Sequence, residues 1–243
     1  MPNKLSLTRI VYCLSLVALM SLPTRSLASQ PQCNRFALNS QAMVVESLAA
    51  DSSAGASVLP TSLSKIYSNL GTGNNVYSSA GCDESGPESP NGVEFQPMAF
   101  TPKADYSVKR IDLAVSWLYG NNDYVLTLRA DNGGIPGAIL IKWPHLSAAY
   151  YGTCCALETV KVPRTHKPVL VQKGKQYWLV VTAREYAWLL WNLNTTNASG
   201  KGALSHDGKM WVKKSFNPNG AFDVLGVRQD YLDGGVQAPQ SPD

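Results

Sequence analysis

The most constraining feature of this sequence is a series of short stretches in which apolar and polar residues alternate, with turn-forming residues between them. The clearest stretch runs from Tyr106 to Tyr119, where Ile111, Leu113 and Val115 fall on one face. Strict alternation is the pattern of a half-buried β-strand. The turn signals recur about every 8–12 residues, which is typical of an all-β sandwich. The sequence therefore predicts an all-β fold, an antiparallel β-sandwich with jelly-roll-like topology.

The other expected strands are placed by the same alternation and by the turns that bound them. A run that begins at Val93 is interrupted by Pro97, which suits an edge strand or a bulge. Residues 69–75 and 81–92 are rich in Gly, Ser, Asn and Pro and are expected to be loops. The remaining expected strands are residues 124–129, 138–143, 156–162, 177–183, 186–192 and 221–227, and a hairpin of 203–205 with 209–212 about Asp207-Gly208.

The N-terminus has the features of a secretory signal peptide. Lys4 and Arg9 precede the apolar run 10–22, and Ser26-Leu27-Ala28 offers small residues for cleavage. An uncleaved membrane anchor is the alternative, but the apolar run is shorter than the roughly 20 residues needed to span a bilayer. We therefore expect a secreted or periplasmic product, with no membrane span in the mature chain.

This interpretation divides the chain into four segments. Residues 1–28 are the signal peptide, and 29–62 form a short helical or irregular leader and linker. Residues 63–228 form the β-sandwich domain, and 229–243 form a disordered tail rich in Pro, Gln, Ser and Asp.

Composition and charge exclude two broad classes of protein. Charged residues make up 16% of the chain, too few for disorder driven by charge. The formal net charge of +4 owes three of its basic residues to the predicted signal peptide, which contains no acidic residue. The rest of the chain is close to neutral and has no clustered basic face, so nucleic-acid binding is not expected.

Four cysteines follow the predicted signal peptide: Cys33, Cys82, Cys154 and Cys155. An even number in an exported chain favours disulfides, and three connectivities are possible. On a strand, adjacent side chains point to opposite faces, so Cys154 and Cys155 would seek different partners. We therefore expect Cys33 and Cys82 each to pair with one of them.

One part of the chain resembles a known family. The stretches that carry the resemblance are Phe100-Thr101-Pro102, Asp131 followed by Gly134-Ile135-Pro136-Gly137, and Lys173-Gly174-Lys175-Gln176-Tyr177-Trp178-Leu179-Val180. Over residues 65–228 the chain resembles the choice-of-anchor R domain of exported bacterial proteins. The resemblance implies an extracellular β-sandwich and no particular activity. The family's surface-sorting tail is missing here, which favours a released or periplasmic product.

Motifs for catalysis are not found. No Gly-x-Ser-x-Gly elbow is present, and His145, His166 and His206 have no partner at motif spacing. A glycosidase needs two carboxylates across a cleft, and the sequence cannot bring any two together. We therefore predict no catalytic, cofactor-binding or metal-binding residue. The acidic candidates by type alone are Asp112, Asp123, Asp131, Glu158 and Glu185.

Calcium is a weaker possibility at two turns, Asn121-Asn122-Asp123 and Asp131-Asn132-Gly133. Calcium takes six to eight oxygen ligands, and neither turn supplies that number. The structural alternative is that Asp and Asn bond to their own turn backbone.

Six tryptophans offer the best candidate binding surface. Trp117 and Trp178 are expected in the core, whereas an exposed indole at Trp143 or Trp191 could stack on a sugar ring. The polar residues Asn192 and Asn194 beside Trp191 could complete such a contact.

These observations favour an exported, non-enzymatic β-sandwich module that binds a carbohydrate or another component of the cell envelope. The first alternative is a purely structural or protein-interaction domain in which every tryptophan is buried. The second is a glycoside-type hydrolase with an unfamiliar pair of acids.

Overall fold

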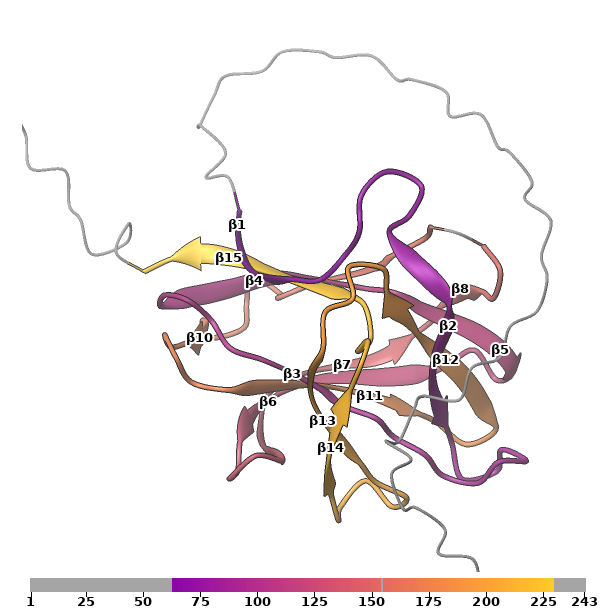
Figure 1. Ribbon diagram of the computed structural model, residues 1–243. Coiled ribbons are helices and arrows are strands. Elements are labelled where there is room, and N and C mark those ends of the chain that lie inside the picture. The colour runs from indigo at the N-terminus through magenta and orange to yellow at the C-terminus, as the bar shows by residue number, and fades with distance from the viewer. Residues whose placement is uncertain (1–62, 154, 230–243) are drawn as a thin grey trace, which may run out of the picture.

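The computed structural model describes residues 63–153 and 155–229, and within them the chain is all-β (Figure 1). Antiparallel sheets pack together as a β-sandwich, so the predicted fold class is confirmed. The expected signal peptide, the leader, Cys33, Cys154 and the tail lie outside the described residues.

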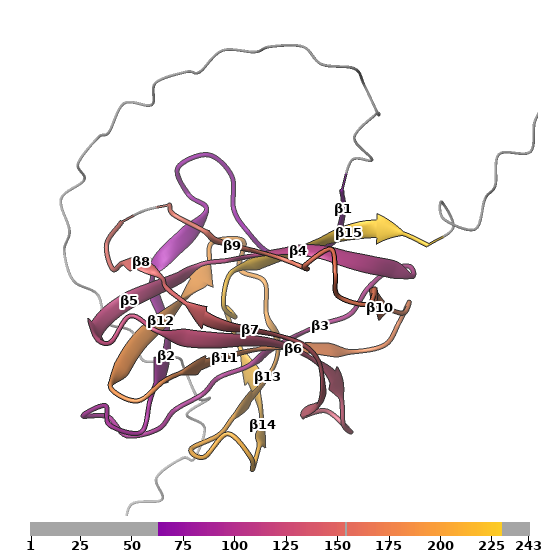
Figure 2. The same cartoon turned by 180° about the vertical axis from the view of Figure 1, so that it is seen from behind.

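Three sheets build the sandwich. The first has the order β1-β15-β4-β10, with β9 also paired to β4. The second has the order β14-β13-β3-β11-β6-β7, and the third has the order β2-β12-β5-β8. In Figures 1 and 2, strands β1, β15 and β4 lie as a layer above β3, β6, β7 and β11.

The strand bounds, sheet by sheet, are as follows. The first sheet contains β1 (Ser64–Ser68), β4 (Tyr106–Leu113), β9 (Glu158–Lys161), β10 (Val169–Val171) and β15 (Phe222–Arg228). The second contains β3 (Met98–Phe100), β6 (Tyr124–Asp131), β7 (Pro136–Leu146), β11 (Tyr177–Ala183), β13 (Gly200–Leu204) and β14 (Val212–Phe216). The third contains β2 (Tyr77–Ser85), β5 (Val115–Gly120), β8 (Ala149–Tyr150) and β12 (Ala187–Asn194).

All three sheets contribute to one apolar core. Its fully buried side chains include Ile111 of β4, Leu128 of β6 and Trp191 of β12. The Trp191 ring packs edge-on against Phe222, with 5.8 Å between ring centroids. The core therefore ties the third sheet to the first through aromatic packing.

The long alternating stretch from Tyr106 to Tyr119 is two strands that lie in different sheets. The break falls at Ala114, which is fully buried. Its N–H donates to the Ala221 carbonyl at 3.1 Å, and its carbonyl accepts from the Asn192 N–H at 2.8 Å. Because alternation continues across this residue, the period of the sequence does not reveal that the chain changes partners here.

One predicted loop and one predicted turn need correction. The sequence predicts a loop over residues 81–92, but residues 81–85 belong to β2, which pairs with β12. A Cβ at Gly81 would lie 2.6 Å from the Trp191 carbonyl oxygen, so close strand approach explains the small residue there. The hairpin about Asp207-Gly208 does form, but its strands meet at Leu204 and Val212 and are joined by residues 205–211.

Strands β1 and β10 are not predicted by the sequence, because each is too short to show a clear alternation. Val169 and Val171 of β10 are buried, whereas Leu170 between them is exposed. This short edge strand borders the candidate site.

Candidate functional site

The predicted stacking platform is wrong for both tryptophans proposed for it. Trp191 is fully buried, and its indole N–H donates to the Ala221 carbonyl at 3.1 Å. Trp143 is 7% exposed, and its indole N–H donates to the Lys161 carbonyl at 2.8 Å. Each ring joins two sheets. An indole can fill the apolar core while its N–H donates to a backbone carbonyl at the edge of that core.

Asn192 and Asn194, predicted as glycan contacts, are also buried and bonded within the protein. Asn192 accepts from the Ser116 hydroxyl at 2.6 Å and donates to the Ser78 carbonyl at 3.0 Å. The Asn194 amide donates to the Asn219 carbonyl at 2.7 Å. Both amides hold neighbouring segments of the protein together.

The exposed aromatic surface consists largely of tyrosines that the sequence pattern does not single out. Tyr119 and Tyr150 are 54% and 63% exposed. The ring centroids of Tyr119 and Tyr186 are 5.4 Å apart, and those of Tyr150 and the partly buried Trp117 are 5.6 Å apart. Trp178 is fully buried, as predicted, whereas Trp117, which is also expected in the core, is only partly buried against it.

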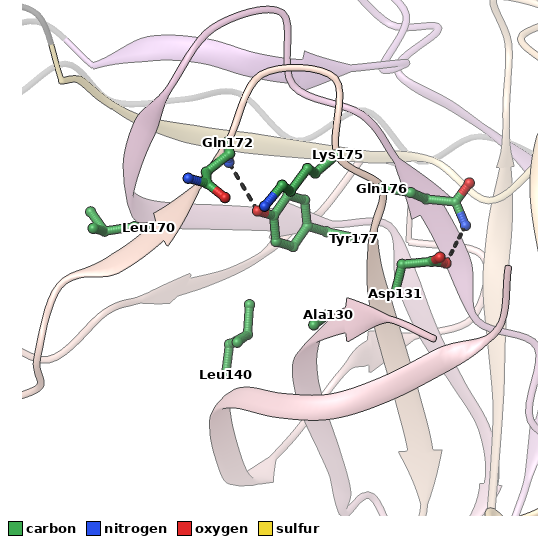
Figure 3. A pocket seen from close by; sticks show the side chains of 8 residues that line it. All are labelled: Ala130, Asp131, Leu140, Leu170, Gln172, Lys175, Gln176 and Tyr177. Carbon is green, nitrogen blue, oxygen red and sulfur yellow. Dashed lines mark hydrogen bonds between the residues drawn. The ribbon is translucent and has the colours of Figure 1, made fainter. Parts of the chain in front are cut away.

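A pocket of about 560 Å³ opens elsewhere, between β10 of the first sheet and β6 and β7 of the second (Figure 3). This volume is within the usual range for a small-molecule site. Leu140 and Leu170 lie on one side, Asp131 and Gln176 on the other, and the Tyr177 ring between them. The lining residues are Ala130, Asp131, Leu140, Leu170, Gln172, Lys175, Gln176 and Tyr177.

Irregular pairing between β6 and β7 shapes one wall of the pocket. Leu128 pairs with Ile141 and Arg129 pairs with Ile139, so Leu140 is an extra residue in the ladder. Such a bulge redirects a side chain and bends its strand. Farther along β7, Trp143 contacts Lys161 of β9, so the two sheets are joined there and open at Leu140.

A tight turn from Gln172 to Lys175 forms the opposite rim. The Lys175 N–H donates to the Gln172 carbonyl at 3.2 Å, and Gly174 has a φ of 73°. That φ is in the left-handed region, where glycine carries no steric penalty. The Gly174 N–H donates to the Pro102 carbonyl at 3.0 Å, and the Lys173 N–H to the Asp105 carboxylate at 2.6 Å.

Asp131 joins the two walls. Its Oδ1 accepts from Gln176 Nε2 at 2.7 Å and from the Trp178 indole N–H at 2.8 Å. Both carboxylate oxygens also accept from the Gly134 N–H, at 3.1 and 3.0 Å. The carboxylate therefore organises the turn after β6 and fixes Gln176 at the start of β11.

The polar groups left for a ligand come mainly from the turn. Tyr177 Oη accepts from the Gln172 N–H at 2.9 Å, a bond that Figure 3 shows at the rim of the pocket. Among the described residues, the Gln172 side-chain amide and the Lys175 ammonium have no hydrogen-bond or ion-pair partner. The pocket thus combines an aromatic ring and two leucines with amides and one ammonium.

Of these lining residues, the sequence pattern points only to Asp131, as a turn or calcium residue. The sequence nevertheless contains a signal that could have indicated the pocket. Two of the stretches that resemble the family, Asp131–Gly137 and Lys173–Val180, both contribute residues to its lining. Their side-chain identities alone do not show that they are neighbours.

The five acidic side chains considered for catalysis do not pair with one another. Asp112 forms an ion pair with Arg110 at 3.0 Å and accepts from the Thr159 hydroxyl at 2.7 Å. Asp123 lies 3.5 Å from Arg184. Burial raises the pKa of Glu158, and Glu185 is exposed.

The histidines are all exposed, as expected for surface residues. His145 lies 3.3 Å from Asp123 and 3.2 Å from Arg184, at a strand end where its own φ is 55°. His206 lies 2.8 Å from the Val93 carbonyl oxygen.

The two turns considered for calcium are held by their own side chains. Asp131 bonds to the Gly134 N–H, and Asn122 donates to the Ala148 carbonyl at 2.8 Å and accepts from the Ala148 N–H at 2.8 Å. Within residues 63–153 and 155–229, no three side chains of His, Cys, Asp or Glu are grouped to hold a metal ion.

Two of the four cysteines are described. Cys82 is fully buried on β2, and Cys155 is partly buried with its Sγ 3.6 Å from the Asn74 carbonyl oxygen. Because Cys33 and Cys154 lie outside the described residues, the predicted connectivity stays a prediction.

Within the residues that the structure describes, no helix has the length and apolar character needed to cross a membrane.

Comparison of the chain with models of protein families, with curated proteins and with solved structures finds no match. The resemblance to the choice-of-anchor R domain therefore stays a prediction.

Proposed function

We propose that this protein is an exported, non-enzymatic β-sandwich module that binds a carbohydrate in the pocket between β10, β6 and β7. The observation that carries the proposal is the pocket itself, with a volume of about 560 Å³ and a mixed apolar and polar lining. The binding residues proposed from the structure are Leu170, Gln172, Lys175, Gln176 and Tyr177.

The chemistry of the lining suits a sugar ring. A pyranose has apolar C–H faces that pack on apolar side chains, here Leu170, which is 52% exposed, and the partly buried Leu140. Its hydroxyls both donate and accept, as do the amides of Gln172 and Gln176. Because Gln176 is held by Asp131 at 2.7 Å, part of the site is ordered before a ligand arrives.

Export is supported by the predicted signal peptide and by the even number of cysteines that follow it, since such a number in an exported chain favours disulfides. A cell-envelope or extracellular glycan is the matching class of ligand.

The test uses residues 29–243 against a panel of neutral and acidic oligosaccharides, with binding measured by isothermal titration calorimetry. We expect at least one glycan to bind, and Leu170→Ala and Gln172→Ala to weaken binding about tenfold or more. Val212→Ala is the matched control, because Val212 is 60% exposed and lies outside the pocket.

Three outcomes would overturn this proposal. No binding across the panel favours a structural or protein-interaction domain, for which Met210 and Val212, 75% and 60% exposed, offer an apolar surface. Equal weakening by Val212→Ala would place the site elsewhere. Release of reducing sugar would identify a hydrolase.

A further inference from the structure

The pocket contains two charged side chains, Asp131 and Lys175, and of these only Asp131 has hydrogen-bond partners among the described residues. Asp131 accepts from Gln176 and Trp178, at 2.7 and 2.8 Å, and from the Gly134 N–H. Hydrogen bonds to an ionised carboxylate stabilise its charge strongly. Among the described residues, the Lys175 side chain forms no ion pair or hydrogen bond, so its ammonium is the charged group that is free to contact a ligand.

The turn holds the start of the Lys175 side chain in a defined place. The Lys175 N–H bonds to the Gln172 carbonyl at 3.2 Å, and the preceding Gly174 bonds to Pro102 at 3.0 Å. The next residue, Gln176, is fixed by Asp131. Another carboxylate at this turn, that of Asp105, accepts from the Lys173 N–H at 2.6 Å.

Lys175 and Gln172 both line the pocket at this rim, where the Gln172 N–H donates to the Tyr177 hydroxyl at 2.9 Å (Figure 3). The ammonium and the Gln172 amide are both donors, and a carboxylate can accept from both at once. The exposed apolar side chain of Leu170 lines the same pocket.

We infer that the pocket selects an acidic sugar, that is, a pyranose that carries a carboxylate; this inference rests on the proposed function. The carboxylate is bound by Lys175 and Gln172. The sugar ring lies against Leu170 and Leu140. Neutral sugars bind the same apolar surface but lack the ionic contact.

The test compares an oligogalacturonate with its carboxyl-reduced counterpart, which has the same ring and linkages without the charge. We expect the wild-type protein to bind the acidic form up to about fivefold more tightly at low salt, the range for a solvent-accessible ion pair. Added salt should reduce this preference because it screens exposed charges.

Lys175→Met should lower the affinity for the oligogalacturonate to the affinity for the carboxyl-reduced form. The affinity for the carboxyl-reduced form itself should change little. Lys209→Met is the matched control, since Lys209 is an exposed lysine of the loop 205–211 outside the pocket. It should keep the full preference.

The failures of the two proposals are distinguishable. Equal binding of both forms by the wild-type protein overturns the acidic preference and leaves the glycan function standing. A preference that survives Lys175→Met overturns the assignment to this lysine. Binding of neither form, nor of any glycan in the wider panel, overturns the function itself.

Discussion

At the scale of single residues, the least expected feature is a carboxyl group inside the sandwich. Glu84 on β2 is fully buried, and both of its carboxylate oxygens accept from the Gln96 backbone N–H, at 3.1 and 3.2 Å. Burial is the largest cause that raises its pKa well above the ordinary value, and the nearby charges of Glu94 and Asp83 add to it. A buried carboxyl group favours its neutral form because the charged form has lost its solvation.

The pH dependence of stability tests this residue. A raised pKa in the folded state means that Glu84 stabilises the fold fully below its unfolded pKa, near 4.5, and loses that contribution as pH rises through the folded pKa. Glu84→Gln keeps an acceptor for the Gln96 N–H and removes the titration. We expect its free energy of unfolding, measured in urea, to fall less than that of the wild type between pH 4.5 and pH 8.

The expected difference is about 1.4 kcal/mol for each unit by which the folded pKa is raised. Glu88→Gln is the control, because Glu88 is an exposed glutamate four residues away. Parallel pH profiles for Glu84→Gln and the wild type would contradict the assignment.

At the scale of elements, two turns define the pocket. The turn after β6 is organised by Asp131, and the turn before β11 by Gly174. Both positions are explained by local chemistry, because a carboxylate can accept several N–H groups and glycine adopts a positive φ freely.

Asp131→Ala should destabilise the protein and disorder the pocket together. It leaves the N–H of the fully buried Trp178 without its acceptor, which costs about 1–3 kcal/mol. Thermal unfolding and glycan titration would measure both effects. Asn132→Ala, at an exposed neighbour, should be close to neutral; an equal loss there would show that the turn as a whole, and not the carboxylate, is responsible.

Gly174→Ala should cost about 1–2 kcal/mol, because an L-residue is strained at a φ of 73°. Open space surrounds the position, and a Cβ added there would have no other atom within 4 Å, so strain and not collision is responsible. Gly174→Asn should cost less, since Asn tolerates this conformation better. Urea unfolding would rank the three proteins, and a more stable alanine variant would contradict the argument.

At the scale of the whole molecule, the tryptophans divide into two groups. Trp143, Trp178 and Trp191 are buried, whereas Trp117, Trp188 and Trp211 are partly exposed. The guanidinium of Arg129 lies over the Trp211 ring, 6.0 Å from its centroid. The buried group holds the sheets together, and the second group borders solvent.

Acrylamide quenching of the folded protein should therefore be partial. Trp211→Phe should lower the quenchable share of the emission, and Trp191→Phe should lower the unquenchable share. Complete protection of all emission, or complete quenching, would contradict this division of the indoles.

The sequence by itself determined the all-β class and many of the strands, because alternation and turn residues are local properties that survive in any tertiary context. It also determined which turns need Asp131 and glycine. Only the tertiary structure decided that the stretch from Tyr106 to Tyr119 divides between sheets at Ala114, since alternation does not specify a strand's partner. It also decided that Trp191 is buried and that Lys175 faces a pocket, because both depend on contacts between segments far apart in the chain.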